Sequence, residues 1–393
     1  MIFSATTALY VGDTSYSKAY IGDTQVWPIE PQPIYDDKYF TTIIRSDGTI
    51  GFTSGSQTGT TIYYRVNNNN WHEIVLMNTG STINVLSGDV VEWKSEAWKE
   101  LANRSVPYLT GTSYYDACGN IMSLAYGDDF ENKYDLATDY IRFHFIFFET
   151  NLVNANNLVL PATTLLPLCY ECMFCGCTSL VSAPELPATN IPSSGYSYMF
   201  SGCTSLVSAP ELPATTLGDG CYNYMFGGCT SLVSAPKVLP ATALSQYCYS
   251  YMFDNCTSLV SAPELPATTL AVYCYSEMFE RCTSLVNAPI LPATTLAERC
   301  YNGMFSMCAS LVNAPILPAT TLVKRCYYYM FSNCTSLSYV KCLAENDINQ
   351  NNSIDYWLMN VSQTGTFVKK TGTTWPITQY GTGIPSGWTV IEE

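Results

Sequence analysis

Residues 266–291 read P-A-T-T-L-A-V-Y-C-Y-S-E-M-F-E-R-C-T-S-L-V-N-A-P-I-L, and close copies of this 26-residue stretch recur along half of the chain. The Met-Phe pair of each copy begins at Met173, Met199, Met225, Met252, Met278, Met304 and Met330. A strict period of this length is typical of a solenoid, whose coils are too short to bury a core alone and must stack on one another. The sequence therefore predicts seven full coils, from residue 158 to residue 342.

The apolar residues of one copy indicate how a coil is built. In the third copy, Cys221-Tyr222 and Met225-Phe226 are four residues apart, which places both pairs on one side of a helical turn. The stretch 231–239 alternates and is bounded by prolines, as a short strand would be, and the threonine-rich stretch 213–217 is also extended. We expect two extended legs, stacked as a parallel ladder, and one helical leg whose apolar side faces the core.

These repeat residues carry a family resemblance. The C-Y-x-x-M-F-x-x-C-T-S-L-x-x-A-P core, preceded by P-A-T-T-L, resembles the BspA-type leucine-rich repeats that are common in gut Bacteroidetes and their phages. The resemblance covers about half of the chain and rests on seven copies. It implies a fold that is mainly β with short helices, and a surface for adhesion or recognition rather than an enzyme.

Composition narrows the choice of partners. The chain has 393 residues and a formal net charge of −15, although only 12% of its residues are charged. This negative charge disfavours nucleic acids and anionic membrane surfaces. Hydrophobic residues make up 47% of the chain, enough to bury a large core. Neutral glycans and proteins remain as the favoured partners.

The region before the array divides in three. The echo Tyr10-Val-Gly-Asp-Thr and Tyr20-Ile-Gly-Asp-Thr predicts two short strands with Gly-Asp turns, in an N-terminal docking element over residues 1–30. A proline-rich linker follows at residues 31–37. Short strand patterns separated by turn signals then predict an antiparallel β-sandwich over residues 38–130.

Both ends of the array are expected to be capped, because an open end exposes apolar core and an unpaired strand edge. Residues 131–157 form the transition and N-terminal cap, in which Phe147-Phe148 lies 26 residues before Met173-Phe174 and marks a degenerate coil. Residues 343–393 form the C-terminal cap, with a predicted helix over 353–361.

The cysteine pattern favours free thiols in the core. Fifteen of the seventeen cysteines lie within the array, and copy two has Gly195 at the first repeat cysteine while it retains Cys203. A disulfide would not lose one partner in this way, whereas cysteine is well suited to a buried apolar position. In the first copy, Cys172 and Cys175 create C-x-x-C spacings that zinc can use, but no later copy has them. Zinc is therefore the lesser alternative, and we expect no bound metal or cofactor.

A calcium loop and a catalytic centre are also disfavoured. The alternating polar residues 347–355 imitate a calcium loop, but Asn352 replaces the required glycine and Leu358 replaces the bidentate glutamate. The two histidines, His72 and His144, have no neighbouring nucleophile motif. Adjacent carboxylates such as Asp128-Asp129 fit solvated turns better than glycoside hydrolysis. We expect no catalytic residues.

Positions that change from copy to copy are expected on the outer surface, and they define a candidate binding strip. The strip consists of Tyr198, Tyr224, Tyr251, Tyr247, Tyr273, Glu277, Arg299 and Arg325. Stacked tyrosines offer a flat apolar face with a polar tip, which suits sugar rings or a protein partner. Ordinary packing between neighbouring coils is the alternative interpretation.

The N-terminal residues provide the evidence for where the protein is located. Residues 1–12 contain no secretory signal pattern, and no transmembrane span is predicted. A recognition protein without an export signal reaches the exterior most simply by cell lysis, and the N-terminal echo resembles short elements that begin phage structural proteins. We therefore expect a virion surface protein, a fibre or decoration subunit, made in the host cytoplasm. It would dock on virion proteins through Tyr10, Tyr20 and Trp27 and bind a glycan or protein of the host surface.

The alternative is a bacterial cell-surface adhesin of the same repeat type, exported by a route that the sequence does not reveal. Homo-oligomers are compatible with either expectation, and neither requires insertion into a membrane.

Overall fold

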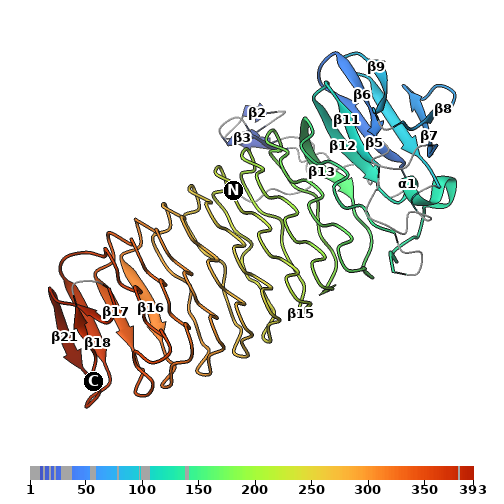
Figure 1. The fold of residues 1–393 in the computed structure, drawn as a ribbon. Coiled ribbons are helices and arrows are strands. Elements are labelled where there is room, and N and C mark those ends of the chain that lie inside the picture. The colour runs from blue at the N-terminus through green and yellow to red at the C-terminus, as the bar shows by residue number, and fades with distance from the viewer. Residues whose placement is uncertain are drawn as a thin grey trace.

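The computed structural model describes residues 9–11, 14–16, 19–21, 24–27, 38–53, 59–77, 79–96, 98, 107–137, 141–378 and 381–393. A β-sheet region occupies one end of the molecule, and a long stack of coils extends from it to the C-terminus (Figure 1). No helix in this described part is long and apolar enough to span a membrane.

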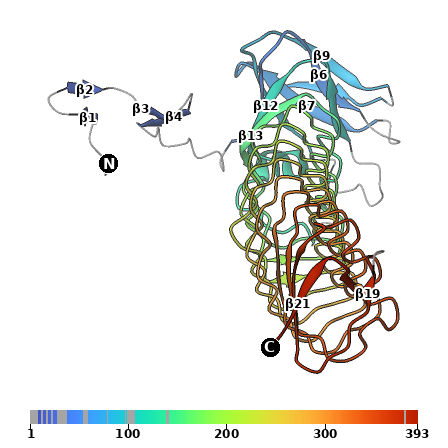
Figure 2. The ribbon, with the colours of Figure 1, turned by 90° about the vertical axis from the view of Figure 1, so that its left-hand side faces the viewer.

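The N-terminal element contains two antiparallel hairpins where the sequence predicted two strands. Strand β1 (Leu9–Val11) pairs with β2 (Thr14–Tyr16), and β3 (Ala19–Ile21) pairs with β4 (Thr24–Trp27) (Figure 2). Each copy of the echo thus spans a hairpin, because its Gly-Asp pair separates two short strands. The predicted docking residues Tyr10, Tyr20 and Trp27 lie on these strands, and their side chains lie outside the described part of the structure.

In the sheet region that follows, the described residues form nine strands. They are β5 (Phe40–Ile44), β6 (Gly48–Thr53), β7 (Thr61–Val66), β8 (His72–Val75), β9 (Ser81–Val85), β10 (Val90–Lys94), β11 (Tyr108–Gly111), β12 (Tyr115–Asn120) and β13 (Leu152–Val159). One sheet has the order β13-β12-β5-β10-β7-β8, and the other has the order β11-β6-β9. All pairs are antiparallel except β12 with β13.

Side chains from the two sheets meet in a shared core. On β10, Val91 and Trp93 are fully buried, as the alternation of a half-buried strand requires. The Trp93 ring contacts Phe52 of β6 edge to face, with ring centroids 5.2 Å apart, and thereby joins the sheets. The predicted antiparallel β region is confirmed.

The sheet region and the array form one continuous ladder. Strand β13 pairs in parallel with β12 of the sheet, and Asn154 of β13 forms a parallel bridge with Ser182 of the first full coil. The degenerate coil is present, but its register differs by one residue from the sequence alignment. Phe147, rather than Phe148, stacks on Phe174, with centroids 5.0 Å apart.

The leg expected to be helical is a run of turns. The described residues of the array contain no helix, and α1 (Ser123–Tyr126) and the 3-10 helix η2 (Gly127–Asp129) lie outside it. In the first full coil, the Glu171 amide donates to Leu168 three residues back, whereas the Cys172 amide donates to Ser197 of the next coil. Along this leg the backbone amides donate alternately to a carbonyl three residues back and to a carbonyl of the next coil. We call this segment of each coil the turn leg.

A left-handed residue at every fourth position explains why this leg cannot be a helix. In the first full coil the φ angles of Leu168, Cys172 and Gly176 are 65°, 54° and 74°. An α-helix requires negative φ throughout, so each positive φ starts a new turn. The four-residue spacing of Cys221-Tyr222 and Met225-Phe226 reflects this turn period, and sequence periodicity alone could not separate it from a helical period.

The core of the array contains a stack of phenylalanine rings, a stack of tyrosine rings and the buried repeat cysteines. Seven phenylalanines begin at Phe174 and end at Phe331, all fully buried, with successive centroids 5.1 to 5.6 Å apart. The inward position predicted for these rings is confirmed. A parallel stack begins at Tyr170 and ends at Tyr327. All seventeen cysteines are free thiols, and the Cys229 thiol donates to the Phe200 carbonyl at 3.1 Å.

The extended legs form the expected parallel ladder but with very short pairings. Ser234 bridges to Ser208 and to Ser261, and equivalent bridges recur between the later coils. Each pairing is brief because Pro236 follows two residues later and has no amide hydrogen to donate. The second extended leg pairs as β14 (Asn190–Ile191) with β15 (Thr216–Leu217).

The ladder continues beyond Cys342. Strands β16 (Asn313–Leu317), β17 (Tyr339–Cys342), β18 (Gly365–Lys369) and β21 (Trp388–Glu392) form one parallel sheet, and β19 (Ile377–Thr378) pairs with β20 (Ile384–Pro385). The helix predicted over 353–361 is wrong. Positive φ angles at Asn352, Tyr356 and Asn360 make this segment another turn leg.

Candidate binding face

The left-handed residues form three columns along the turn leg, and together they define what we call the turn face. The first column contains Leu168, Ser194, Gly220, Tyr247, Tyr273, Arg299 and Arg325. The second column contains Cys172, Tyr198, Tyr224, Tyr251, Glu277, Gly303, Tyr329 and Tyr356. The third column contains Gly176, Gly202, Gly228, Asn255, Arg281, Met307, Asn333 and Asn360.

All eight residues of the predicted strip belong to the first or second column. Each of them is half-buried or exposed, in contrast to the fully buried tyrosine stack of the core. No column position holds valine, isoleucine or threonine, because a branched Cβ is strained at positive φ. The type of side chain at these positions therefore varies between coils, whereas the backbone conformation stays the same.

The second column carries an aromatic strip that is exposed at Tyr198 and half-buried at Tyr224 and Tyr251. Tyr198 stacks on Tyr224 with centroids 5.2 Å apart, and Tyr224 contacts Tyr251 at 5.8 Å. Tyr198 is 40% exposed. Packing between coils and an exposed aromatic surface thus occur together, and the two interpretations of these residues are compatible.

The first column combines aromatic and basic side chains. Tyr247 stacks on Tyr273 with centroids 4.7 Å apart, and the Arg299 guanidinium lies over the Tyr273 ring at 4.9 Å. In the next coil Arg325 instead lies over Tyr328 of its own coil, at 5.2 Å. Such cation–π contacts hold the guanidinium planes against the turn face.

A charged cluster anchors the middle of the turn face. Asp254, whose side chain is only 1% exposed, accepts hydrogen bonds from the Tyr224 hydroxyl and from both ends of the Arg281 guanidinium at 3.0 to 3.2 Å. Burial and these interactions with Asp254 raise the pKa of Tyr224 to about 12. The buried carboxylate is thus paired, as its burial requires.

Beyond Tyr251 the aromatic strip is interrupted and a hollow replaces it. Glu277 and Gly303 occupy the next two positions of the second column, before the tyrosines resume with Tyr329 and Tyr356, 4.9 Å apart. The hollow has a volume of about 410 Å³. We call it the Gly303 hollow; its lining includes Glu277, Glu280, Asn302, Ser306, Met307, Tyr328, Tyr329 and Met359.

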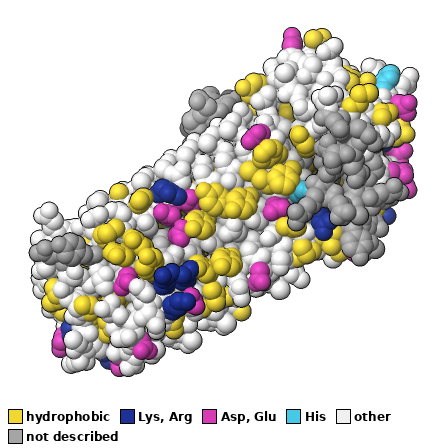
Figure 3. Space-filling view, viewed as in Figure 1, with side chains coloured by type: hydrophobic (Ala, Val, Ile, Leu, Met, Phe, Trp, Pro, Cys, Tyr) yellow, Lys and Arg dark blue, Asp and Glu magenta, His cyan; other side chains and the backbone are white. Residues whose placement is uncertain are grey.

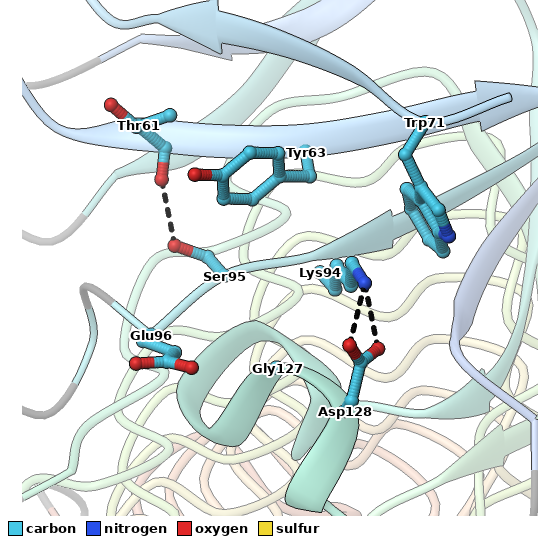
Figure 4. A pocket seen from close by; sticks show the side chains of 8 residues that line it. All are labelled: Thr61, Tyr63, Trp71, Lys94, Ser95, Glu96, Gly127 and Asp128. Atoms are coloured by element: carbon cyan, nitrogen blue, oxygen red, sulfur yellow. Dashed lines mark hydrogen bonds and ion pairs between the residues drawn. The ribbon is translucent and has the colours of Figure 1, made fainter.

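A second hollow, of about 640 Å³, lies on the outer face of the six-stranded sheet (Figure 4). Tyr63 and Trp71 supply aromatic rings, and Lys94 Nζ lies 4.4 Å from the Trp71 ring centroid. Lys94 also donates to both oxygens of Asp128, at 2.7 and 2.9 Å. The hydrogen bonds from Lys94 and Tyr39 lower the pKa of Asp128.

Asp128 is exposed, in agreement with the solvated turn predicted for it, and it also forms an ion pair with Lys94 beside the aromatic hollow. The sequence does not reveal this hollow, because Asp128 and Lys94 are 34 residues apart and come together only in the folded sheet region. A tryptophan that directly follows the polar turn 67–70 was the one available signal.

The exposed valine column on an extended leg is the main alternative surface. Val181, Val207, Val233, Val260, Val286 and Val312 are each 40 to 51% exposed. In the later coils Ile290 and Ile316 lie on the same leg and are 82% and 54% exposed. Figure 3 shows that hydrophobic side chains lie beside charged ones on the visible face of the array.

The described residues offer little support for a metal site or for a nucleophilic cysteine. No group of three or more His, Cys, Asp or Glu side chains there could hold a metal ion. The Cys172 and Cys175 thiols hydrogen-bond to each other, which raises the pKa of Cys172 and lowers that of Cys175. Burial raises the pKa of the repeated core thiols, such as Cys229 to about 12, so they stay protonated near neutral pH.

The family assignment follows from the repeated coil. The model of the BspA type leucine-rich repeat region, which contains six copies, matches residues 147–269 and 221–356, together more than half of the chain. The chain belongs to the BspA-type leucine-rich repeat family. Members of this family are typically non-catalytic binding proteins.

A solved structure and the curated sequences add little to this BspA-type assignment. A leucine-rich repeat protein from Bacteroides ovatus ATCC 8483 shares 15% identity with a TM-score of 0.23, over 62% of this chain and 84% of the other. No curated protein matches the chain.

Proposed function

We propose that this BspA-type protein is a non-catalytic recognition protein that binds a surface glycan or protein on its turn face. The observation that carries the proposal is the aromatic strip Tyr198, Tyr224 and Tyr251, which is stacked by the coil repeat and remains accessible. The backbone conformation does not favour tyrosine at these left-handed positions, where glycine or asparagine is less strained. Aromatic residues placed there against the backbone preference indicate a surface selected for binding.

We place the protein at a bacterial cell surface, as an adhesin, ahead of the virion fibre or decoration subunit. The family match supports a recognition array, and no phage protein is among the matches. Docking on virion proteins through residues 1–30, and homo-oligomers, stay as predictions. Labelling with an antibody against the array would separate the two locations, since it would mark intact producing cells in one case and purified particles in the other.

Binding to an array of neutral glycans and to intact gut bacteria tests the proposal. The test variant combines Tyr198→Ala, Tyr224→Ala and Tyr251→Ala. The matched control combines Val207→Ala, Val233→Ala and Val260→Ala, which removes apolar surface from the same coils on the extended leg. We expect the tyrosine variant to lose at least about tenfold in affinity, since each aromatic contact contributes about 0.5–1.5 kcal/mol beyond area burial. Loss in the control alone would move the binding face to the valine column.

A further inference from the structure

The Gly303 hollow has a composition that differs from the rest of the turn face. Its lining joins carboxylates (Glu277 and Glu280), an amide (Asn302), tyrosine rings (Tyr328 and Tyr329) and methionine side chains (Met307 and Met359). Glycine is essential to its shape, because a Cβ at position 303 would lie 2.7 Å from Cγ of Glu277. The hollow therefore exists only where the tyrosine strip is interrupted.

The acidic side of the hollow is held in place by its neighbours. The Asn302 side-chain amide donates to Glu277 Oε1 at 2.9 Å, and the Tyr251 hydroxyl also bonds to Glu277. Around Glu280 the charged groups are Glu277 and Arg281 of its own coil and Asp254 of the preceding coil. Three carboxylates thus share one guanidinium, which is hydrogen-bonded to Asp254 at 3.0 Å and lies 3.7 Å from Glu280.

An unused polar group points to a ligand. Ser306 lines the hollow, is only 7% exposed, and its hydroxyl makes no hydrogen bond within the part of the chain that the structure describes. Because the hydroxyl itself keeps accessible surface and the residue lines the hollow, it is available to form a hydrogen bond with a ligand there. It lies in the same hollow as the two glutamates and the aromatic wall.

We propose that the Gly303 hollow binds a lysine or arginine side chain of a protein partner. The cationic head would lie at Glu277 and Glu280, where charge-assisted hydrogen bonds are strongest. The methylene stem would lie against Tyr329, Met307 and Met359, whose apolar surfaces suit it better than the hydroxyl groups of a sugar. The inference rests on the proposed recognition role and assigns one partner chemistry to one site of the turn face.

The two glutamates give the site a pH signature. Burial, followed by the proximity of Glu277 and Asp254, raises the pKa of Glu280 to about 7, while Arg281 opposes this rise. A bound cation favours the ionised carboxylate and lowers that pKa. Affinity should therefore rise with pH through neutrality, by about tenfold between pH 6 and pH 8, and binding near pH 6 should release a proton.

Methionine methyl NMR of the full chain tests the proposal at the site itself. Nα-acetyl-lysine methylamide is the probe, the norleucine analogue is its uncharged match, and glucosamine represents an amino sugar. We expect the lysine probe to shift the methyl signals of Met307 and Met359 and to leave Met77, which is 60% exposed and distant in sequence, unchanged. The norleucine analogue should produce no comparable shift.

Variants complete the test. Glu280→Gln should weaken lysine binding about tenfold and remove its dependence on pH. The matched control Glu298→Gln removes a carboxylate that pairs with Lys324 outside the hollow and should leave binding unchanged.

Three results would overturn the inference: equal binding of the norleucine analogue, tighter binding of glucosamine, or an affinity that does not change with pH. Tyr251 bonds to Glu277 and so belongs to both sites, whereas Tyr198 and Tyr224 do not line the hollow. Loss of glycan or cell binding in a Tyr198→Ala, Tyr224→Ala variant that still binds the lysine probe would therefore support the proposed function independently.

Discussion

At the residue scale, backbone conformation decides which side chains the turn face can present. Every column residue has φ between 54° and 78°, so the residue must tolerate the left-handed region. Glycine and asparagine dominate the third column, whereas most positions of the first two hold tyrosine, arginine or glutamate. The cost of a side chain at such a position is about 1–2 kcal/mol relative to glycine. The tyrosine, arginine and glutamate side chains on this face are therefore retained against a conformational preference.

Asn255 provides a direct check of this rule, because its φ is 57° and its backbone amide bonds to the next coil. Asn255→Gly should leave the free energy of unfolding nearly unchanged or raise it slightly. Asn255→Val should lower it by about 1–2 kcal/mol, because a branched Cβ is strained at positive φ. Urea denaturation measures both. The control Ser258→Val, at a position without positive φ, should change stability by less than about 0.5 kcal/mol.

At the element scale, each coil is held by the same three buried contacts. Phe226 stacks between Phe200 and Phe253, and the Cys256 thiol donates to its carbonyl at 3.2 Å. This hydrogen bond explains the second repeat cysteine better than packing alone, because alanine would lose the donor and leave a gap. The coil is thus a unit whose interior leaves little room for substitution.

Phe226→Ala should lower the free energy of unfolding by about 3–5 kcal/mol, the usual cost of a cavity left by a buried aromatic ring. Cys256→Ala should cost less, about 1–2 kcal/mol, because a smaller side chain and one weak donor are lost. Circular dichroism during urea denaturation is the measurement. The exposed control Val233→Ala should stay within about 0.5 kcal/mol. A Phe226→Ala cost similar to that control would contradict the stacked core.

Some elements could be predicted from the sequence, and others could not. The period of the Met-Phe pair predicted the array, its two extended legs and the buried phenylalanines, because repeats convert spacing directly into position. The turn leg was predicted as a helix, since residues such as Tyr224 and Glu277 give no sign of positive φ. The hollows at Gly303 and Trp71 depend on contacts between residues far apart in the sequence. The repeat pattern of the sequence does not reveal such contacts.

At the scale of the whole molecule, one ladder joins the sheet region to the last strand. Parallel pairing of β12 with β13 begins it, and β18 with β21 ends it (Figure 1). The segment after Cys342, predicted to cap the array, is built of further coils of the same ladder. Its terminal contacts include the stack of Trp357 on Tyr327 and on Trp375, with centroids 6.2 and 5.6 Å apart.

The free thiols predict that redox conditions hardly affect stability. Adding a reductant should leave the midpoint of thermal unfolding unchanged, because no disulfide links the described coils. Differential scanning calorimetry with and without reductant measures this. A fall of several degrees would indicate a disulfide, since loss of one typically costs about 2–5 kcal/mol.

Deleting residues 1–30 should leave the array folded, because two isolated hairpins contribute little to a shared core. Circular dichroism and calorimetry of the truncated chain should match those of the full chain. If the N-terminal element docks on a particle, the truncated chain should also fail to be incorporated. Normal incorporation would contradict the predicted docking role of Tyr10, Tyr20 and Trp27.

Hydrogen exchange of the full chain, with and without the tightest binder from the glycan and cell panel, tests the central claim most directly. Binding on the turn face should slow exchange of backbone amides in residues 194–202, 220–228 and 247–255, which form the columns around the aromatic strip. Exchange near Val207, Val233 and Val260 should not change. Protection confined to those valine segments, with none on the turn face, would contradict the account.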